Sequence, residues 1–223
     1  MKMTDRKYGK MAAMGSQLWH DTDIVALDLE GSGAQDRDAE AILEVAVVPL
    51  IHGQPDLDRA FTSLVNPGRP IPQRPWISPG LTDAVLAEAQ PLAAIAARLG
   101  ELIDGRWVLG HNVNVDWRLL SRRLPGLRPA GLLDTLTLAR TMDVPDRSLS
   151  ALVESLRLRE AMLAAAGDSQ PHRAYWDTVA TAYLLPKLIH RLWPKKVPTF
   201  DSLRLAAGVA LPAEPSEQPG LFD

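Results

Sequence analysis

The stretch "DIVALDLEG", residues 23–31, decides the fold class and carries the first chemical signal of the chain. Its apolar residues predict a buried β-strand. Asp28 and Glu30 are two residues apart, so on a strand both side chains project from one face, with Leu27 and Leu29 on the other. Two neighbouring carboxylates repel each other, and a divalent cation between them relieves that repulsion. The pair is therefore a candidate Mg²⁺ or Mn²⁺ site, and the alternative is that either acid caps or ends the strand.

The sequence on the C-terminal side of this stretch predicts the rest of the domain. Apolar, β-branched runs predict strands over residues 41–53, 58–67 and 106–112, and a fifth begins at residue 131 and turns helical before residue 140. Helical periodicity predicts helices over residues 81–89, 91–104, 115–124, 148–158 and 175–185, the last kinked or ended near Pro186. This order of elements predicts an α/β domain with a mixed five-stranded sheet flanked by helices.

Composition limits the chemistry and the domain organisation. The chain has 223 residues, of which 46% are hydrophobic, and we expect a leader over residues 1–21, one domain over 22–193 and a Pro-rich tail over 194–223 without regular structure. The absence of cysteine excludes a thiolate nucleophile and Cys-ligated metals, so a metal must bind to oxygen or imidazole. Without a long apolar run we expect no membrane contact and a soluble cytoplasmic protein. The net charge of −3 gives no overall attraction to nucleic acid.

Two further acids lie on the apolar stripes of predicted helices. Asp116 shares its stripe with Leu119 and Leu120, and Asp177 shares its stripe with Leu184. Burial of an ionised acid is costly unless a cation or a metal compensates it. Each acid alone has another explanation, since Asp116 is favoured at the positive end of its helix and Asp177 could form a salt bridge. Four acids on apolar faces together favour a metal site.

Nucleotide-binding loops fit the sequence poorly. In "DLEGSGAQD" the third glycine of a dinucleotide fingerprint would fall at position 36, where Asp36 stands, and a charged loop and a strand follow instead of a helix. No P-loop pattern occurs in the sequence. ATP use and dinucleotide binding therefore have no support.

Three motifs resemble those of the DEDDh 3′–5′ exonucleases, the family of the proofreading epsilon subunit of bacterial DNA polymerase III. They are Asp28-Leu29-Glu30-Gly31-Ser32-Gly33, then Gly110-His111-Asn112-Val113-Asn114-Val115-Asp116, then His172 to Asp177 in a His-Arg-Ala setting. The segment around Thr82 and the acid Glu44 are softer matches, and the resemblance covers residues 22–190. Gly31 and Ser32 replace two threonines of the family, and Val115 replaces a phenylalanine. The resemblance implies a ribonuclease-H-like fold.

The resemblance also implies a reaction and its residues. It implies hydrolysis of the 3′-terminal phosphodiester of a nucleic acid, with release of 5′-mononucleotides, by two divalent ions, Mg²⁺ or Mn²⁺, about 3.5–4 Å apart. Asp28, Glu30 and Asp177 would hold one ion, and Asp28 with Asp116 the other. His172 would be the general base. Substrate contacts would come from the residues of the motifs and the softer segment, namely Leu29, Gly31, Ser32, Thr82, His111 and Asn112.

The position of His172 follows from helix geometry. Five residues separate it from Asp177, which is about 140° around an ideal helix, so the two cannot share one face. We expect His172 in the loop or first turn beside Pro171, free to move toward the substrate. The alternative is an ordinary surface histidine before a helix.

The identity of the substrate stays open between DNA, in proofreading or repair, and RNA that is trimmed by the same chemistry. A binding module that has lost catalysis is a further alternative, against which the intact acids argue. Trp76, Trp117 and Tyr175 are candidates for stacking on bases or for the core. The arginines at 118, 122, 123 and 128 could follow a phosphate backbone or form a solvated helix face.

The chain ends in "EQPGLFD", which resembles the short peptide by which bacterial replication and repair proteins bind the sliding clamp. Gln218, Leu221 and Phe222 would make that contact, tethering the protein at DNA. The alternatives are an incidental tail or one that folds back on its own domain.

Overall fold

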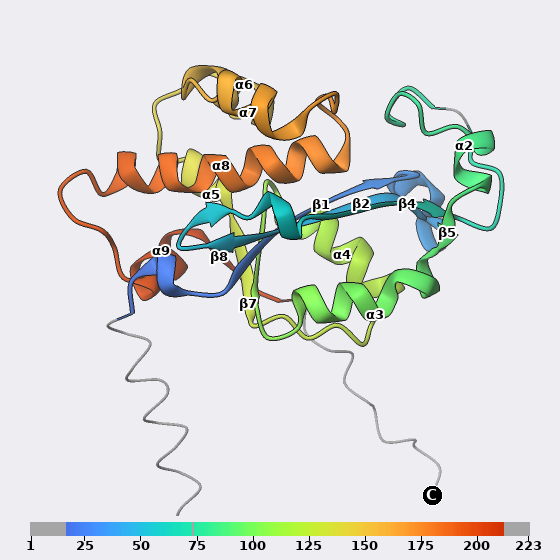
Figure 1. Ribbon diagram of the computed structural model, residues 1–223, viewed down its shortest axis with the longest axis horizontal. Helices are drawn as coiled ribbons and strands as arrows, with labels where there is room; N and C mark the ends of the chain where they lie inside the picture. The colour runs from blue at the N-terminus through green and yellow to red at the C-terminus, as the bar shows by residue number, and fades with distance from the viewer. Residues whose placement is uncertain (1–16, 73, 212–223) are drawn as a thin grey trace, which may run out of the picture.

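The computed structural model describes residues 17–72 and 74–211, and its centre is an eight-stranded mixed sheet between two layers of helices (Figure 1). The strand order is β5-β4-β2-β1-β6-β7-β8, and β3 pairs with β2. The strands are β1 Ile24–Gly31, β2 Ile42–Ile51, β3 Gln54–Pro55, β4 Phe61–Asn66, β5 Gln90–Pro91, β6 Trp107–Gly110, β7 Gly131–Asp134 and β8 Gly208–Val209. The five longest are the five strands that the sequence predicts, and the predicted α/β class is confirmed.

β1 lies in the middle of the sheet and sets the two faces. It pairs antiparallel with β2 and parallel with β6, which pairs parallel with β7. Ile24 and Ala26 belong to one hydrophobic cluster, and Val25 and Leu27 belong to the other. The side chains of β1 therefore alternate between the two faces of the sheet, as its sequence predicts. The register with β2 shifts between Glu30 and Gly31, so the chain turns aside directly after the second acid.

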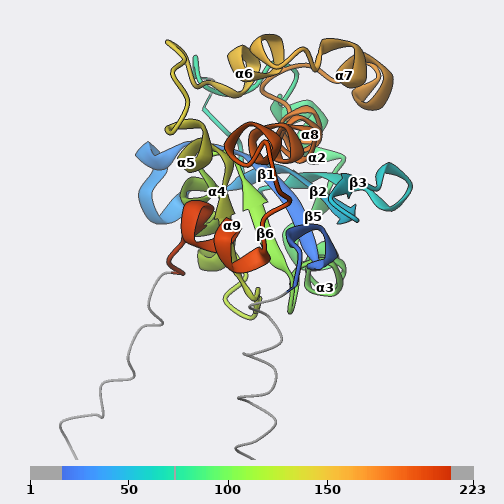
Figure 2. The ribbon, with the colours of Figure 1, turned by 90° about the vertical axis from the view of Figure 1, so that its left-hand side faces the viewer.

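The α-helices form a layer on each face of the sheet. They are α2 Asp83–Ala87, α3 Leu92–Ile103, α4 Val113–Arg123, α5 Thr135–Ala139, α6 Leu149–Ser155, α7 Arg159–Ala166, α8 Ala174–Leu192 and α9 Phe200–Ala207. Short 3-10 helices are η1 Trp19–Asp21, η2 Ala34–Ala39 and η3 Leu57–Arg59. The long helix α8 crosses one face of the sheet, with α6 and α7 stacked above it, and α3 and α4 cover the other (Figures 1 and 2).

Of the two outcomes expected near Pro186, a kink or the end of the last long helix, the end is wrong. Pro186 lies inside α8, which continues to Leu192. Buried leucines stand on both sides of the proline, at Leu184, Leu185 and Leu188. Their packing outweighs the cost of about 3 kcal/mol that an internal proline imposes. The helix predicted over 148–158 is also shorter than expected, because α6 ends at Ser155 and a separate helix, α7, follows.

The prediction that the chain has no regular structure after residue 193 is wrong for residues 199–209. Thr199 caps α9 by accepting a hydrogen bond from the backbone N–H of Ser202, and Phe200 and Leu203 are fully buried. β8 then pairs antiparallel with β7. Pro194 and Pro198 precede this segment and favour an irregular tail, so the short amphipathic helix after them was not predicted.

The predicted start of the domain at residue 22 is also too late in the sequence. Trp19 is buried in the core, and Leu18 forms a β-bridge with Thr199. The packed domain thus extends beyond the predicted range of 22–193 at both ends. The predicted clamp-binding residues, Gln218, Leu221 and Phe222, lie outside the described residues.

Within the described ranges, the model contains no helix with the length and apolar character needed to cross a bilayer.

Candidate active site

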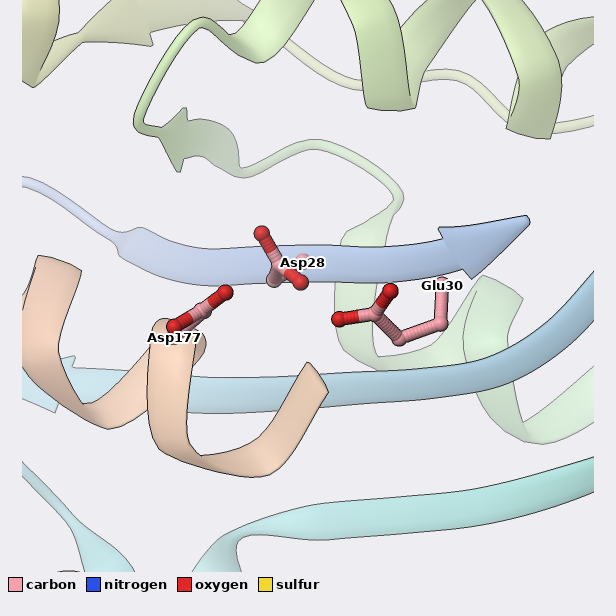
Figure 3. Close-up of side chains that lie close together, drawn as sticks. All are labelled: Asp28, Glu30 and Asp177. Atoms are coloured by element: carbon pink, nitrogen blue, oxygen red, sulfur yellow. The ribbon is translucent and has the colours of Figure 1, made fainter. Parts of the chain in front are cut away.

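Three carboxylates converge where α8 crosses β1. Asp28 and Glu30 project from the face of β1 that α8 covers, and Asp177 projects from the first turn of α8 toward them (Figure 3). One oxygen from each of the three carboxylates lies within 4.8 Å of the others, and all three residues are partly buried. Asp177 therefore faces inward because the acids of the central strand lie beneath it.

The start of α8 is fixed by an ion pair with the neighbouring strand. Arg173, the N-cap residue, donates two hydrogen bonds of 2.8 Å through Nε and Nη2 to the carboxylate of Glu44 on β2. The same carboxylate accepts a bond of 3.2 Å from the backbone N–H of Ala174, the first residue of the helix. A buried carboxylate at this point satisfies a free N–H group and the positive end of the helix together. Asp177 lies one turn further on, so this contact sets its height above β1.

Asp116 lies beside the group of three rather than within it. It sits in the first turn of α4 and is buried, and its Oδ1 accepts a hydrogen bond of 3.2 Å from the backbone N–H of Leu29. Its charge raises the pKa of Asp28, so the two carboxyl groups interact electrostatically. The structure thus places Asp116 next to the group of three, with two acids on the central strand β1 and one each on α8 and α4, which cover its opposite faces.

The pKa values of these acids are raised above their ordinary range, chiefly by burial. Burial followed by the charges of Asp116 and Asp177 raises the pKa of Asp28. Burial raises the pKa of Glu30 to about 7, against a 2.5 Å hydrogen bond from the Ser78 hydroxyl that favours the ionised form. Burial likewise raises the pKa of Asp116 to about 8 and that of Asp177 to about 6. Without a cation, the cluster therefore holds protons near neutral pH.

A divalent cation fits this donor set. Carboxylate oxygens are the ligands that hard cations such as Mg²⁺ and Mn²⁺ prefer. Burial and the mutual repulsion of these acids raise their pKa values, and a bound cation would favour the ionised carboxylates. The cluster can therefore hold a divalent metal ion.

His172 lies in the loop just before α8, beside Pro171, where helix geometry places it. Its side chain is exposed, its φ of 66° is in the left-handed region, and its backbone N–H donates a 3.4 Å hydrogen bond to Asp177 Oδ1. The side chain is near enough to Asp177 that its charge would lower the pKa of that acid, after the larger opposing effect of burial. The His172 side chain is thus exposed on a short loop beside the acids.

Several residues predicted to contact substrate also make contacts within the scaffold. The Ser32 side chain is buried and its Oγ accepts a 2.9 Å hydrogen bond from the backbone N–H of Ala41. Thr82 caps α2 by accepting from the N–H of Val85. Leu29 belongs to the core on the α4 side of the sheet.

His111 and Asn112 of the second motif also make hydrogen bonds within the scaffold. His111 contacts the Thr135 hydroxyl through Nδ1 and the Arg147 carbonyl through Nε2, both at 2.9 Å. Asn112 adopts a left-handed conformation with φ of 71° at the N-cap of α4, and its N–H donates to Asp134 Oδ1 at 2.7 Å. These contacts set where α4 begins and hence where Asp116 lies.

The basic run on α4 holds a loop of the protein itself. Arg118 forms two hydrogen bonds, of 2.7 and 3.0 Å, with the buried carboxylate of Glu40, and Arg123 donates to the backbone carbonyls of Asp38 and Glu40. These contacts fix the segment between β1 and β2. Sequence reasoning did not identify Glu40 or Ser78, because their partners are 78 and 48 residues away and no local pattern marks them.

A mixed sheet between helical layers, with acids from a central strand and a covering helix meeting at one point, defines an α/β protein whose acidic cluster can hold divalent cations. The chain belongs to the exonuclease family, whose model matches residues 25–185.

Individual relatives agree with this assignment. The chain is 27% identical over 187 residues to the 3′–5′ exonuclease DinG of Bacillus subtilis (strain 168), covering 81% of this chain and 19% of that protein. It is 29% identical over 185 residues to a DNA polymerase III subunit epsilon-like protein of Rhodobacter capsulatus, covering 81% of this chain and 25% of that protein. The chain thus spans a quarter or less of these two curated relatives.

A solved structure of exonuclease X in complex with 5′ overhanging duplex DNA has the same fold. Its TM-score is 0.59 and its identity 24%, and the match covers 81% of this chain and 98% of that one. The expected ribonuclease-H-like fold is confirmed.

Proposed function

We propose that this protein is a 3′–5′ exonuclease that hydrolyses the 3′-terminal phosphodiester of DNA and releases 5′-mononucleotides, with two Mg²⁺ or Mn²⁺ ions. The observation that carries the proposal is the convergence of Asp28, Glu30 and Asp177 within 4.8 Å, in a chain of the exonuclease family. Four carboxyl groups with raised pKa values are a costly arrangement that the fold would not need for packing alone.

Each residue has a role in this proposal. Asp28, Glu30 and Asp177 would hold one ion, and Asp28 with Asp116 would hold the second. Bound divalent ions supply charge neutralisation for the attacking and leaving oxygens of a phosphodiester. Ser78 holds the Glu30 carboxylate by its hydrogen bond, and the backbone N–H of Leu29 holds that of Asp116.

His172 is the general base in this proposal. A neutral imidazole accepts a proton readily near pH 7, and the His172 side chain is exposed next to Asp177. Its Nδ1 or Nε2 would accept the proton of the attacking water, and the imidazole would then release that proton to solvent. The ion pair between Arg173 and Glu44 anchors the chain directly after His172, and the backbone N–H of His172 donates to Asp177 Oδ1, so both contacts hold the imidazole near the acids.

DNA is the proposed substrate, used in proofreading or repair, and the proposed compartment is the cytoplasm. The name of the epsilon-like relative and the DNA in the exonuclease X structure support this choice. RNA trimming by the same residues is the alternative within the same chemistry. The C-terminal sequence Gln218-x-x-Leu221-Phe222 supports the further proposal that the tail binds a sliding clamp.

The test is a cleavage assay with matched 5′-labelled single-stranded DNA and RNA, in Mg²⁺, in Mn²⁺ and in chelator. We expect a metal-dependent ladder that shortens from the 3′ end, faster on DNA, and absent in Asp177→Asn. Asp58→Asn, a change to an exposed acid on η3, is the matched control and should keep the ladder.

Faster cleavage of RNA would replace the proposed substrate. Absence of a ladder both in Mg²⁺ and in Mn²⁺ would contradict the proposed reaction. Mn²⁺ binding measured by calorimetry would then show whether the acids form a metal site without catalysis.

A further inference from the structure

Of the three aromatic side chains that the sequence offers for base stacking, one is available at the surface. Trp117 is 4% exposed and belongs to the core under β1. Tyr175 packs against the other core cluster, and its hydroxyl donates to the Ala165 carbonyl. Trp76, in the segment between β4 and α2, is 46% exposed. An indole with nearly half its surface in water contributes little to the core.

Trp76 is nevertheless held in one orientation. Its Nε1–H donates a 3.3 Å hydrogen bond to the backbone carbonyl of Ser32, in the loop directly after β1. The edge of the indole lies against Gly33, where an added Cβ would come within 2.4 Å of Nε1 and where φ is +99°. Gly33 thus allows both the turn of the loop and the close approach of the ring. A side chain already fixed loses little conformational entropy when a ligand stacks on it.

The indole is tied to the acidic cluster by short connections along the chain. Ser32, which accepts its hydrogen bond, is two residues after Glu30. Ser78, two residues after Trp76, donates to Glu30 Oε2. The first link leads along the backbone to Glu30 and the second ends at its carboxylate, so the segment that carries the ring is tied to the end of β1 that bears this acid.

A cation completes the surface. The guanidinium carbon of Arg74 lies 5.4 Å from the centroid of a Trp76 ring, in a cation–π arrangement. The protein carries a net charge of −3 and an acidic cluster, both of which repel a polyanion. Arg74 therefore places a positive charge beside the indole, where it would attract a phosphodiester chain.

We propose that Trp76, with Arg74, is a stacking surface for the base at the 3′ end of the substrate, and that it favours ends whose terminal base is already unpaired. This inference rests on the proposed exonuclease function. A base that stacks on Trp76 must leave its partner in a duplex, which costs a few kcal/mol for a paired base and less for a mismatched or single-stranded one. Because every base has a π face, the surface would not select a particular sequence.

The experiment compares two substrates that differ in a single base. One single-stranded DNA ends in a normal 3′ nucleotide, and the other ends in an abasic nucleotide with the same phosphodiester. Base–aromatic stacking is worth about 1–3 kcal/mol, so the parent protein should bind the normal end about 5- to 150-fold more tightly than the abasic end. Equal affinity for the two ends would overturn the proposal without any variant.

Variants then locate the effect. Trp76→Ala should raise the KM for the normal end several-fold, leave the KM for the abasic end unchanged, and reduce the preference for a mismatched over a matched duplex end. Trp76→Phe, which keeps a ring but loses the bond to Ser32, should fall between Trp76→Ala and the parent. Leu163→Ala, which truncates a 69% exposed leucine on α7, is the matched control and should change nothing. An equal rise in KM for both ends in Trp76→Ala would assign Trp76 a purely structural role and contradict the proposal.

The two proposals fail differently. If the parent protein cleaves neither substrate, the exonuclease function fails, and fluorescence anisotropy of labelled oligonucleotides still measures whether the normal end binds better than the abasic end. If cleavage occurs with the same KM on both ends, the exonuclease function stands and the stacking surface is refuted.

Discussion

Glu30 is expected to destabilise the metal-free protein as the pH rises, and Glu30→Gln is expected to remove that cost. Burial raises the pKa of Glu30 from its ordinary value of 4.5 to about 7. Between these values the unfolded chain has released the proton that the folded chain still holds, so the free energy of unfolding falls as the pH rises and stays low above pH 7. Each tenfold change in proton affinity is worth about 1.4 kcal/mol, so the loss amounts to about 3 kcal/mol as an upper limit.

The assay is urea unfolding in chelator from pH 5 to pH 8. The parent protein should lose stability across this range, and Glu30→Gln should lose less, because an amide carbonyl can still accept the hydrogen bond from Ser78 and carries no charge. At pH 8 the variant should be more stable than the parent by about 2–3 kcal/mol. Asp116 and Asp177 shift in the same direction, so part of the slope should remain in the variant. Glu101→Gln, at an exposed acid of α3, is the control and should leave the slope unchanged.

Adding Mn²⁺ at pH 8 should reverse the order of stability. The parent binds the cation in its folded state and gains stability by mass action, whereas Glu30→Gln lacks one ligand and gains less. The reasoning is refuted if the metal-free variant is less stable than the parent at pH 8, or if metal-free parent protein gains stability from pH 5 to pH 8 relative to the variant.

Three further changes test the scaffold by urea unfolding. Arg173→Met leaves the buried carboxylate of Glu44 without a cation and should lower the free energy of unfolding by about 3 kcal/mol. It should also lower kcat, because α8 is displaced. A decrease in the free energy of unfolding below about 0.5 kcal/mol, as for surface pairs, would contradict the role of this pair. Phe200→Ala empties a fully buried position of α9 and should cost about 3–5 kcal/mol, whereas no loss would mean that this segment is not part of the folded domain. Gly53→Ala would place a Cβ 2.3 Å from an indole ring at φ of +74° and should cost about 1–3 kcal/mol, while Gly126→Ala, with open space at its Cβ, should be neutral.

The predictions that the structure bears out rest on local periodicity. The alternation in residues 23–31 predicted that Asp28 and Glu30 share one face, and the two hydrophobic clusters divide the odd and even residues of β1 accordingly. The loop position of His172 followed from the angle between residues five apart on a helix. Both arguments use geometry within one element, which the sequence fixes closely.

The features that sequence reasoning missed depend on contacts between distant segments. Thr199 to Val209 pack as a helix and a strand because β7 offers a free edge and the core leaves room for Phe200, and neither fact is visible in the segment itself. Ser32 and His111 lie in recognisable motifs, yet their side chains are used for hydrogen bonds inside the scaffold. Their partners, Ala41 and Thr135, lie in other segments of the chain, so these contacts become visible only in the fold.

In the part of the chain that the structure describes, Glu44 is paired with an arginine whereas the acids beside it are not, and this difference defines the candidate metal site. Glu44 has a full ion pair with Arg173, whereas Asp28, Glu30 and Asp177 form no salt bridge with lysine or arginine within residues 17–72 and 74–211. The neighbours that hold Glu30 and Asp177 are a hydroxyl and a backbone N–H group, which orient a carboxylate without neutralising it. An arginine placed among these three acids would lower their pKa values and occupy the position that a divalent cation would take. The scaffold thus pairs the acid that anchors α8 with an arginine and gives no salt bridge, within the described residues, to the three acids that point at one another, so their carboxylate oxygens can hold a cation.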